Sequence, residues 1–330
     1  MLCKKTNFSF LSISFLLSQM FLFFSIQAQQ NPGITFYNFN SSYSNPATVG
    51  LNGESFVQLH YRNQWTQYQS SYDGSGNLGT QIATISLGVD DLHLGGGLQY
   101  MNDLTPSGVG LQFMRSQFAY HYAIGDGVLS AGAQIGISTK SFDGRVFRLR
   151  DPNDPLVNEF TGKSIAKSSF DLGLGLLYSR DRWSVGAYLD HLNSPSFAFS
   201  SSAGQSSLLP MLTVIGSANF EISEQIVFNP FTQVRSYQGQ YVGDLGMRIH
   251  FAKLFWLGGN YRTDDALSGM FGFSIWKKQI DFAYALDRTI SNQSIKAPIS
   301  HEFFVRFNLP NFKLRKNIAL PINTPRFKIN

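Results

Sequence analysis

The sequence predicts an all-β protein, a transmembrane outer-membrane β-barrel of about 14 antiparallel strands with an N-terminal plug-like segment. Between Leu51 and Pro310, segments of roughly ten residues alternate apolar and polar side chains and then break at Gly, Asp, Asn or Ser. Alternation gives a strand one apolar and one polar face. So many such segments, with no long apolar run after the N-terminus, are typical of a barrel that meets lipid on its outside. Composition agrees, because aromatic residues make up 15% of the chain and charged residues only 14%.

The alternation also assigns a face to each side chain. In the segment 113–123, for example, Phe118 and Tyr120 point one way, while Gln117 and His121 point the other. The predicted strands are 54–62, 79–88, 92–101, 113–123, 128–138, 169–179, 183–190, 210–221, 225–235, 240–250, 254–262, 267–275, 279–287 and 300–308.

The lengths of the connections distinguish the two sides of the membrane. Connections after even-numbered strands are tight, as at Val89-Asp90 and Asp181-Arg182, whereas those after odd-numbered strands are mostly longer. The short connection around Gln238 is the exception. Outer-membrane barrels combine short periplasmic turns with long outer loops and an even strand number. We therefore expect both ends of the mature chain to lie in the periplasm.

The N-terminus has the pattern of a secretory signal peptide. Lys4 and Lys5 provide a positive start, an apolar stretch runs from Phe8 to Ile26, and Ala28 precedes the expected cleavage. Cleavage would remove Cys3, the only cysteine, and leave no thiol for a disulfide or metal. The predicted organisation is a signal peptide (1–28), a periplasmic or plug segment (29–53), a barrel (54–310) and a basic tail (311–330).

The tail accounts for much of the positive charge of the chain, whose net charge is +5. Since this charge lies in one appendage, it does not indicate nucleic-acid binding. Two interpretations remain open: a solvated chain end, and a strip that docks on an acidic periplasmic partner or on the cell wall. The candidate docking residues are Lys313, Arg315, Lys316, Arg326 and Lys328.

The polar faces of the predicted strands carry charges of both signs, which we expect to pair inside the barrel. An ion-selective pore would favour one sign. Inward-facing glycines leave room for another part of the chain, and we expect residues 29–50 to occupy it. The predicted luminal charges are His60, Arg62, Arg115, His121, Asp171, Asp190, Asp244, Arg248, His250, Asp281, Asp287, Glu302 and Arg306, and the glycines are Gly95, Gly97, Gly173, Gly175 and Gly272.

Aromatic residues mark the outward ends of several strands. They fit an interfacial girdle, and they also fit a rim that binds a folded terminal domain of a secreted client, because Tyr and Arg are enriched in binding hot spots. The candidate rim contacts are Tyr61, Arg62, Gln64, Trp65, Tyr261, Arg262 and Asp265.

Motifs for catalysis, cofactors or metals are nearly absent. Gly162-Lys163-Ser164 lacks the upstream glycine of a phosphate loop, because Val157 stands there. Asp151-Pro152-Asn153-Asp154 is more typical of a turn than of a calcium site. His191 beside Asp190 is the one hydrolase candidate, but adjacent residues of a strand face opposite ways. We predict no catalytic, cofactor or metal site, and no enzyme.

Several segments resemble one family. Asn45–Gly50 and Leu59–Trp65 are similar to the N-terminal signature of the PorP/SprF-type membrane proteins, which belong to the type IX secretion and gliding machinery of Bacteroidota. The signature residues are Asn45, Pro46, Ala47 and Gly50, whereas Thr48-Val49 and the basic tail depart from the pattern. Further similar segments are Tyr188–Leu192, Phe255–Arg262, Asp265–Ser268, Phe271–Phe273, Phe282–Asp287 and Ser300–Glu302.

The resemblance implies a non-enzymatic outer-membrane barrel that helps secreted surface proteins, often adhesins, to leave the cell or stay attached to it, with a role in gliding motility. It implies as partners the outer-membrane lipids, a client with a terminal domain, and periplasmic lipoprotein or cell-wall-linked secretion subunits. The alternative prediction is a channel for uptake of hydrophobic or small solutes, and a hydrolase at the rim is the third.

Overall fold

The computed structural model describes residues 31–66, 78–105, 108–146, 162–199, 205–252, 254–291 and 298–310. The predicted signal peptide, residues 29–30 and the tail 311–330 lie outside these ranges, so those predictions stay predictions. The chain divides into two units, Met1–Gly33 and Ile34–Asn330. The fold described below is that of the second unit.

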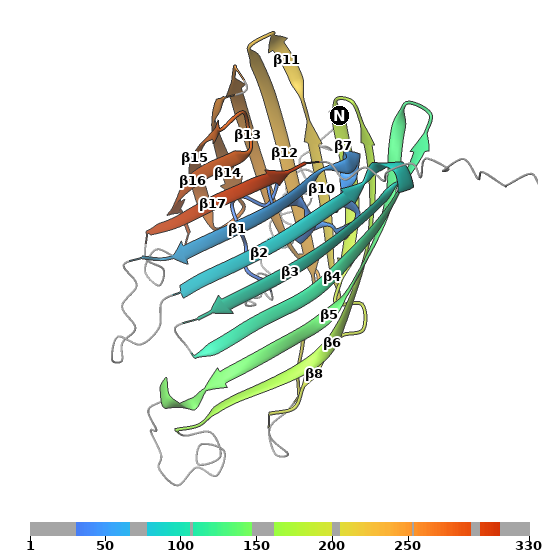
Figure 1. The fold of residues 1–330 in the computed structure, drawn as a ribbon. Helices are drawn as coiled ribbons and strands as arrows, with labels where there is room; N and C mark the ends of the chain where they lie inside the picture. Colours follow the sequence, from blue (N-terminus) through green and yellow to red (C-terminus); the bar gives the residue numbers. More distant parts are fainter. Residues whose placement is uncertain are drawn as a thin grey trace, which may run out of the picture. The chain divides into compact units, whose positions relative to one another are not determined.

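The described strands of the second unit, from Ser55 to Leu309, form a closed antiparallel β-barrel (Figure 1). Each strand pairs with its neighbours in sequence, β1 pairs with β17, and β10 pairs with both β7 and β12, which completes the ring. The strands are β1 (Ser55–Gln64), β2 (Leu78–Val89), β3 (Leu94–Leu104), β4 (Val109–Ile124), β5 (Gly127–Asp143), β6 (Ser164–Arg180), β7 (Trp183–Asp190), β10 (Met211–Ala218), β11 (Phe220–Ser223), β12 (Ile226–Tyr237), β13 (Gln240–Phe251), β14 (Phe255–Arg262), β15 (Ala266–Ile275), β16 (Ile280–Thr289) and β17 (Ile299–Leu309).

The strand prediction is confirmed. The sheet contains 15 strands, and β10 and β11 are two parts of one pass interrupted at Asn219, so the wall is crossed 14 times. β4, β5 and β6 are longer than predicted at the ends that meet the β3–β4 and β5–β6 connections. Of the helices among the described residues, none is both long and apolar enough to cross a membrane.

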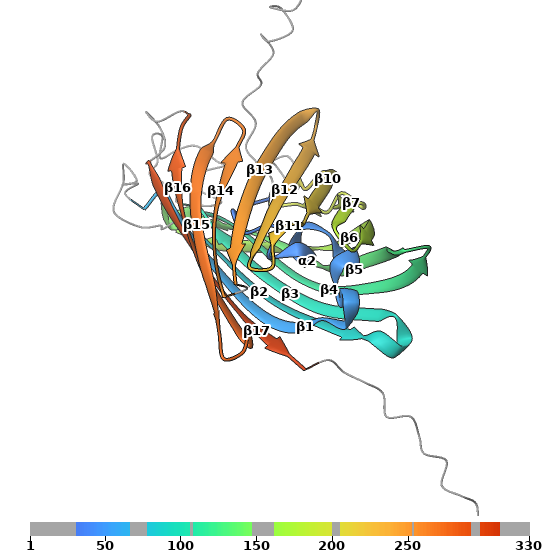
Figure 2. The same cartoon turned by 90° about the horizontal axis from the view of Figure 1, so that it is seen from above.

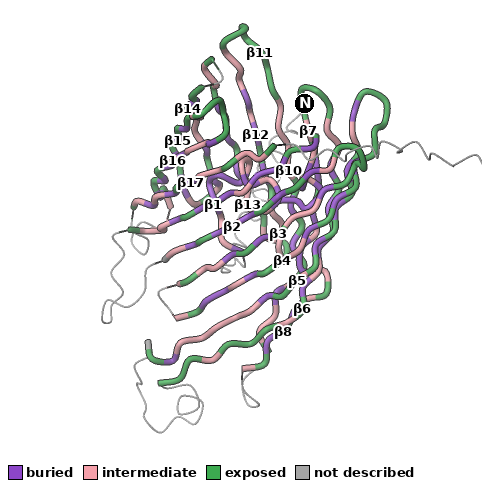
Figure 3. The backbone as a smooth tube through the Cα atoms, viewed as in Figure 1, coloured by how far each residue is buried: buried purple, intermediate pink, exposed green. Residues whose placement is uncertain are grey.

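The two faces of the wall alternate as predicted, which Figure 3 shows as alternating exposed and buried positions along the strands. On β6, Phe170, Leu174 and Leu176 are exposed on the outside, while Asp171 and Leu177 are buried inside. This apolar outer band and polar interior identify a membrane-spanning barrel of the outer-membrane type.

A short irregular segment lies within the barrel (Figure 2). We call Ile34–Gly53 the luminal segment; it contains α2 (Ser41–Ser44), η1 (Pro46–Thr48) and η2 (Leu51–Gly53). Phe36 is completely buried and packs in the same apolar cluster as Phe304 of β17. The described elements that are not strands of the barrel are η3 (Asp90–Leu92), η4 (Gly144–Val146) and the small sheet of β8 (Ser196–Phe197) with β9 (Ser206–Ser207).

The lipid face generates a stability prediction on β6. Leu174→Lys places an ammonium in the middle of the apolar band, and we expect it to destabilise the barrel by about 2–4 kcal/mol. Ser168→Lys lies on the same face beyond the apolar band, where the same side chain should cost about 0–1 kcal/mol. Urea unfolding in lipid vesicles measures both free energies, and equal losses would contradict the assigned membrane boundary.

Candidate functional site

The Asn-Pro-Ala turn joins the luminal segment to the wall. Asn45 caps η1 by accepting a hydrogen bond from the Ala47 amide at 2.9 Å, and Pro46 takes the first helical position. The same side chain donates from Nδ2 to the backbone oxygens of Leu176 and Ala187, at 2.9 and 3.3 Å. A single asparagine therefore fixes the turn and attaches it to β6 and β7.

Glycines in the wall make this close approach possible. A Cβ atom at Gly95 would lie 1.8 Å from the Val49 oxygen, and one at Gly175 would lie 2.1 Å from Asn45 Oδ1. Gly50 of the segment has a left-handed backbone (φ 66°) and would clash with the wall if it carried a side chain. A side chain at Gly50 or Gly95 would require a shift of the backbone, and one at Gly175 would displace the Asn45 side chain.

The predicted inward glycines have two kinds of neighbour. Gly95, Gly97 and Gly175 face the luminal segment, whereas Gly173 and Gly272 face the rings of Tyr188 and Trp256 of the wall itself. The sequence analysis missed three further glycines against the segment, for which alternation within β2, β5 and β7 would have been the signal. They are Gly88, Gly132 and Gly186.

The first charged group of the lumen joins β1, β16 and β17. Arg62 lies 2.5 Å from Asp287 and 2.7 Å from Glu302, and the His60 ring lies 2.9 Å from Glu302. All four side chains are almost completely buried. Such a group is stable only when its opposite charges are paired and its remaining polar atoms are hydrogen-bonded.

The luminal segment supplies several of those hydrogen bonds. The amides of Thr35 and Phe36 donate to the Glu302 carboxylate at 2.9 and 2.6 Å. The Thr35 hydroxyl donates to Asp287 at 2.8 Å. Charged side chains of the wall therefore hold the backbone of the segment directly.

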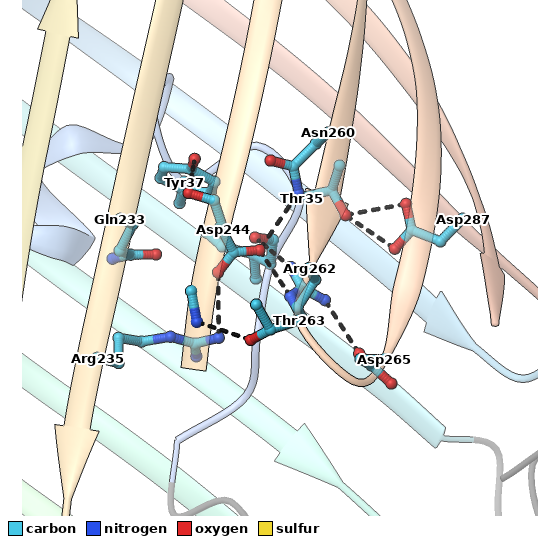
Figure 4. A network of polar contacts seen from close by, with 12 residues as sticks. Thr35, Tyr37, Gln233, Arg235, Asp244, Asn260, Arg262, Thr263, Asp265 and Asp287 are labelled. Carbon is cyan, nitrogen blue, oxygen red and sulfur yellow. Dashed lines mark hydrogen bonds and ion pairs between the residues drawn. The ribbon is translucent and has the colours of Figure 1, made fainter. Parts of the chain in front are cut away.

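A second charged group extends the first across β12, β13 and β14 (Figure 4). Asp244 accepts from Arg262 at 2.8 Å and lies 3.4 Å from Arg235. Arg262 also donates to the backbone oxygen of Ile34 at 2.9 Å. Both groups therefore meet at the same short stretch of the luminal segment.

A third charged group lies on β4, β6 and β7, around Arg115. Its guanidinium is 2.9 Å from Asp171 and 3.3 Å from Asp190. His191 has a left-handed backbone (φ 56°) and turns inward, with ring nitrogens 2.9 Å from Asp171 and 3.4 Å from Asp190.

The expectation that Asp190 and His191 face opposite ways was wrong, because the chain leaves the strand at His191. Asp171, Asp190 and His191 lie close enough together to bind a metal ion. However, the Arg115 guanidinium already contacts both carboxylates, and both ring nitrogens lie beside them. The geometry is that of a structural ion-pair group.

Aromatic side chains fill the lumen beside the charged groups. The Phe36 ring lies 6.0 Å from His60 and 5.8 Å from Phe304, and the Phe39 ring stacks on Trp256 at 4.8 Å. Arg248 covers the Phe39 ring at 4.1 Å. The luminal segment thus contributes aromatic rings to a core that the wall could not form alone.

The candidate rim residues divide between two environments. Tyr61 and Tyr261 point outward and are 40% and 43% exposed, as expected for a girdle. Arg62 and Arg262 are each 2% exposed and bind acids inside the barrel, so the structure does not present them at the rim. Client contact remains a prediction for the other candidates, Tyr61, Gln64, Trp65, Tyr261 and Asp265.

The family comparison covers most of the chain. A family model described as type IX secretion system membrane protein PorP/SprF matches residues 26–307. Among curated proteins, none is significantly similar in sequence.

Two solved barrels are similar to this chain at low sequence identity. The toluene transporter TbuX of Ralstonia pickettii is 13% identical, with 82% of this chain and 93% of that chain covered and a TM-score of 0.48. The toluene transporter TodX of Pseudomonas putida is 11% identical, with coverages of 83% and 94% and a TM-score of 0.47.

The glycine contacts give a matched pair of variants. In Gly95→Ala the new methyl group collides with the Val49 carbonyl, and we expect docking of the luminal segment to weaken by about 1–3 kcal/mol. In Gly96→Ala the methyl group meets nothing within 4 Å, so docking should stay unchanged. Limited proteolysis of the folded barrel measures cleavage within the segment; equal protection in both variants would refute the contact.

The charged groups give a second pair. Glu302→Ala removes the acceptor of the Thr35 and Phe36 amides and one partner of Arg62, and we expect a loss of about 3–5 kcal/mol, the range for a broken buried pair. Asp281→Ala, on the same wall but without a contact to the segment, serves as control. Hydrogen exchange should accelerate at the Thr35 and Phe36 amides in the first variant only. Unchanged exchange in Glu302→Ala would show that the carboxylate does not hold the segment.

Proposed function

This chain belongs to the PorP/SprF family of type IX secretion system membrane proteins, and from that premise we propose that it supports export or cell-surface attachment of secreted proteins, including adhesins. Gliding motility, where the clients are motility adhesins, is part of the proposal. The observation that carries it is the convergence of family-like segments inside the barrel. Arg62, Arg262, Asp287 and Glu302 come from four such segments and meet at Ile34–Phe36.

The contacts between the luminal segment and the wall support a docking role over a simple pore. Acids and arginines of the wall bind each other and the backbone of the luminal segment, and aromatic rings occupy the space between them. An aqueous channel instead leaves its polar lining in contact with water. In our proposal the luminal segment acts as a plug that keeps the barrel shut while partners assemble on its two sides.

The proposed partners follow from the predicted orientation. Short turns in the periplasm would face lipoprotein or cell-wall-linked secretion subunits, and the basic tail 311–330, outside the described residues, is the proposed docking strip. On the outer side, exposed tyrosines of the rim and the longer connections would face the terminal domain of a client. Outer-membrane lipids surround the apolar band.

Uptake of small solutes is the second candidate, and one observation favours it. A cavity of about 190 Å³ lies between the luminal segment and the wall, lined among others by Tyr37, Ser44, Ser184, Ser217 and Arg306. Its hydroxyl groups suit a small polar solute. Transport would require the luminal segment to move, because the segment forms one side of this cavity.

Deletion of the encoding gene tests the proposal. We expect a surface protein with a terminal secretion domain to disappear from the cell surface and to accumulate inside the cell, with display restored by the gene in trans. Surface labelling followed by mass spectrometry measures this. Normal display of every such protein would contradict the proposal.

Planar-bilayer recording separates the two candidates. The purified barrel should conduct little without partners if the luminal segment acts as a plug. Steady conductance of the unmodified protein, or solute uptake that depends on the gene, would favour the channel.

A further inference from the structure

β6 continues beyond the membrane on the side of the long connections. Its outward face is apolar at Phe170, Leu174 and Leu176 but changes to small polar residues at Ser164 and Ser168. The neighbouring outward residue on β5, Thr139, shares a hydrogen bond with the Ser168 hydroxyl at 2.8 Å. Placing outward-facing hydroxyl groups in hydrocarbon costs free energy. We therefore place the stretch Ser164–Ser169 in the aqueous phase.

This stretch has a strand partner on one side only. β6 pairs with β5 as far as Ser164, opposite Asp143, but its pairing with β7 ends at Leu174. Leu192 and Asn193 then bind the backbone of Phe170 and Leu172, at 2.6–3.0 Å. Among the residues that the structure describes, no strand pairs with the remaining edge of Ser164–Ser169; β8 lies close to β6 but pairs with β9.

An open edge of this kind is a template for another strand. Its unpaired N–H and C=O groups are satisfied by water until an extended chain replaces the water. Six residues of strand span roughly 20 Å at about 3.3 Å per residue, enough to align a strand of similar length. Short edges of this type bind extended peptides through main-chain hydrogen bonds.

The charges along the edge indicate what kind of chain it accepts. Lys167 is exposed on the edge strand β6, opposite Lys140 of β5, and like charges directly opposite each other are destabilising. The Lys140 ammonium, one strand away from the edge, donates to the Ser206 hydroxyl at 2.8 Å, so Lys167 is the cation that an added strand would meet. Lys163, just before the strand, is also exposed. Asp143 does not neutralise them, because it is engaged by Arg145 at 2.6 and 2.8 Å.

We propose that Ser164–Ser169 is a docking edge to which an extended, acidic strand of an exported client adds. The inference rests on the proposed function and adds the place and chemistry of client recognition. Main-chain hydrogen bonds supply sequence-independent affinity, and a carboxylate of the client pairs with Lys167. Lys163 extends the positive edge by one more contact.

The test uses the surface protein that disappears when the gene is deleted, and three versions of the full-length barrel in cells. Lys163→Glu/Lys167→Glu reverses the charge of the edge, and we expect binding of the purified terminal domain of that client to weaken at least about tenfold. Lys277→Glu/Lys278→Glu makes the same change at the exposed turn between β15 and β16, and should leave binding unchanged. A photoreactive phenylalanine analogue at position 166 should cross-link to the client.

Each outcome decides one claim. Loss of display on deletion together with normal binding of Lys163→Glu/Lys167→Glu and no cross-link at position 166 would overturn the docking edge and leave the proposed function intact. Normal display on deletion would overturn the proposed function itself. If the double variant fails to assemble, as shown by its heat-modifiable migration in gels, the cross-link at position 166 in the otherwise unmodified barrel decides.

Discussion

The ion pairs between Arg62, Arg262, Asp287 and Glu302 and the backbone of Ile34–Phe36 are the interaction on which the rest of the structure depends. A membrane barrel turns one face of every strand away from lipid, so its polar groups must find partners inside. Removing one partner of a buried ion pair leaves an uncompensated charge, which is strongly destabilising. Without the luminal segment, the carboxylate of Glu302 loses two amide donors and Arg262 loses the Ile34 oxygen. Wall and segment are therefore parts of one folding unit.

The same requirement explains the small residues of the wall. The backbone of the luminal segment approaches the wall closely at glycines of β2, β3 and β5, and the Asn45 side chain does so at glycines of β6 and β7. The glycine contacts and the charged pairs hold different parts of the luminal segment. Glycines and the Asn45 amide position the turn of η1, and charged pairs position the stretch Ile34–Phe36 that precedes α2. Beyond the membrane, the described part of β6 makes neither kind of contact with the luminal segment, and it keeps an open edge there.

Much of this organisation was predictable from the sequence, because alternation is a local property. The strand number, the inward direction of Arg62 and Asp287, and the glycine-lined space all follow from which residues alternate with which. Which charged residues pair does not follow from alternation, because Arg62 and Glu302 are 240 positions apart and meet only through the pairing of β1 with β17. His191 was misjudged because strand alternation was applied to a residue that follows the strand, where a positive φ turns its ring back beside Asp190. The length of β6 was underestimated because its outer end has no apolar face to alternate.

A crystal structure of the mature protein in a lipidic phase tests the central claim most directly. The account predicts density for Ile34–Gly53 inside the barrel, with the Glu302 carboxylate within hydrogen-bonding distance of the Thr35 and Phe36 amides and Arg262 bound to the Ile34 oxygen. A water-filled lumen with this segment outside the barrel, and with Arg62 and Glu302 paired to each other alone, would contradict it.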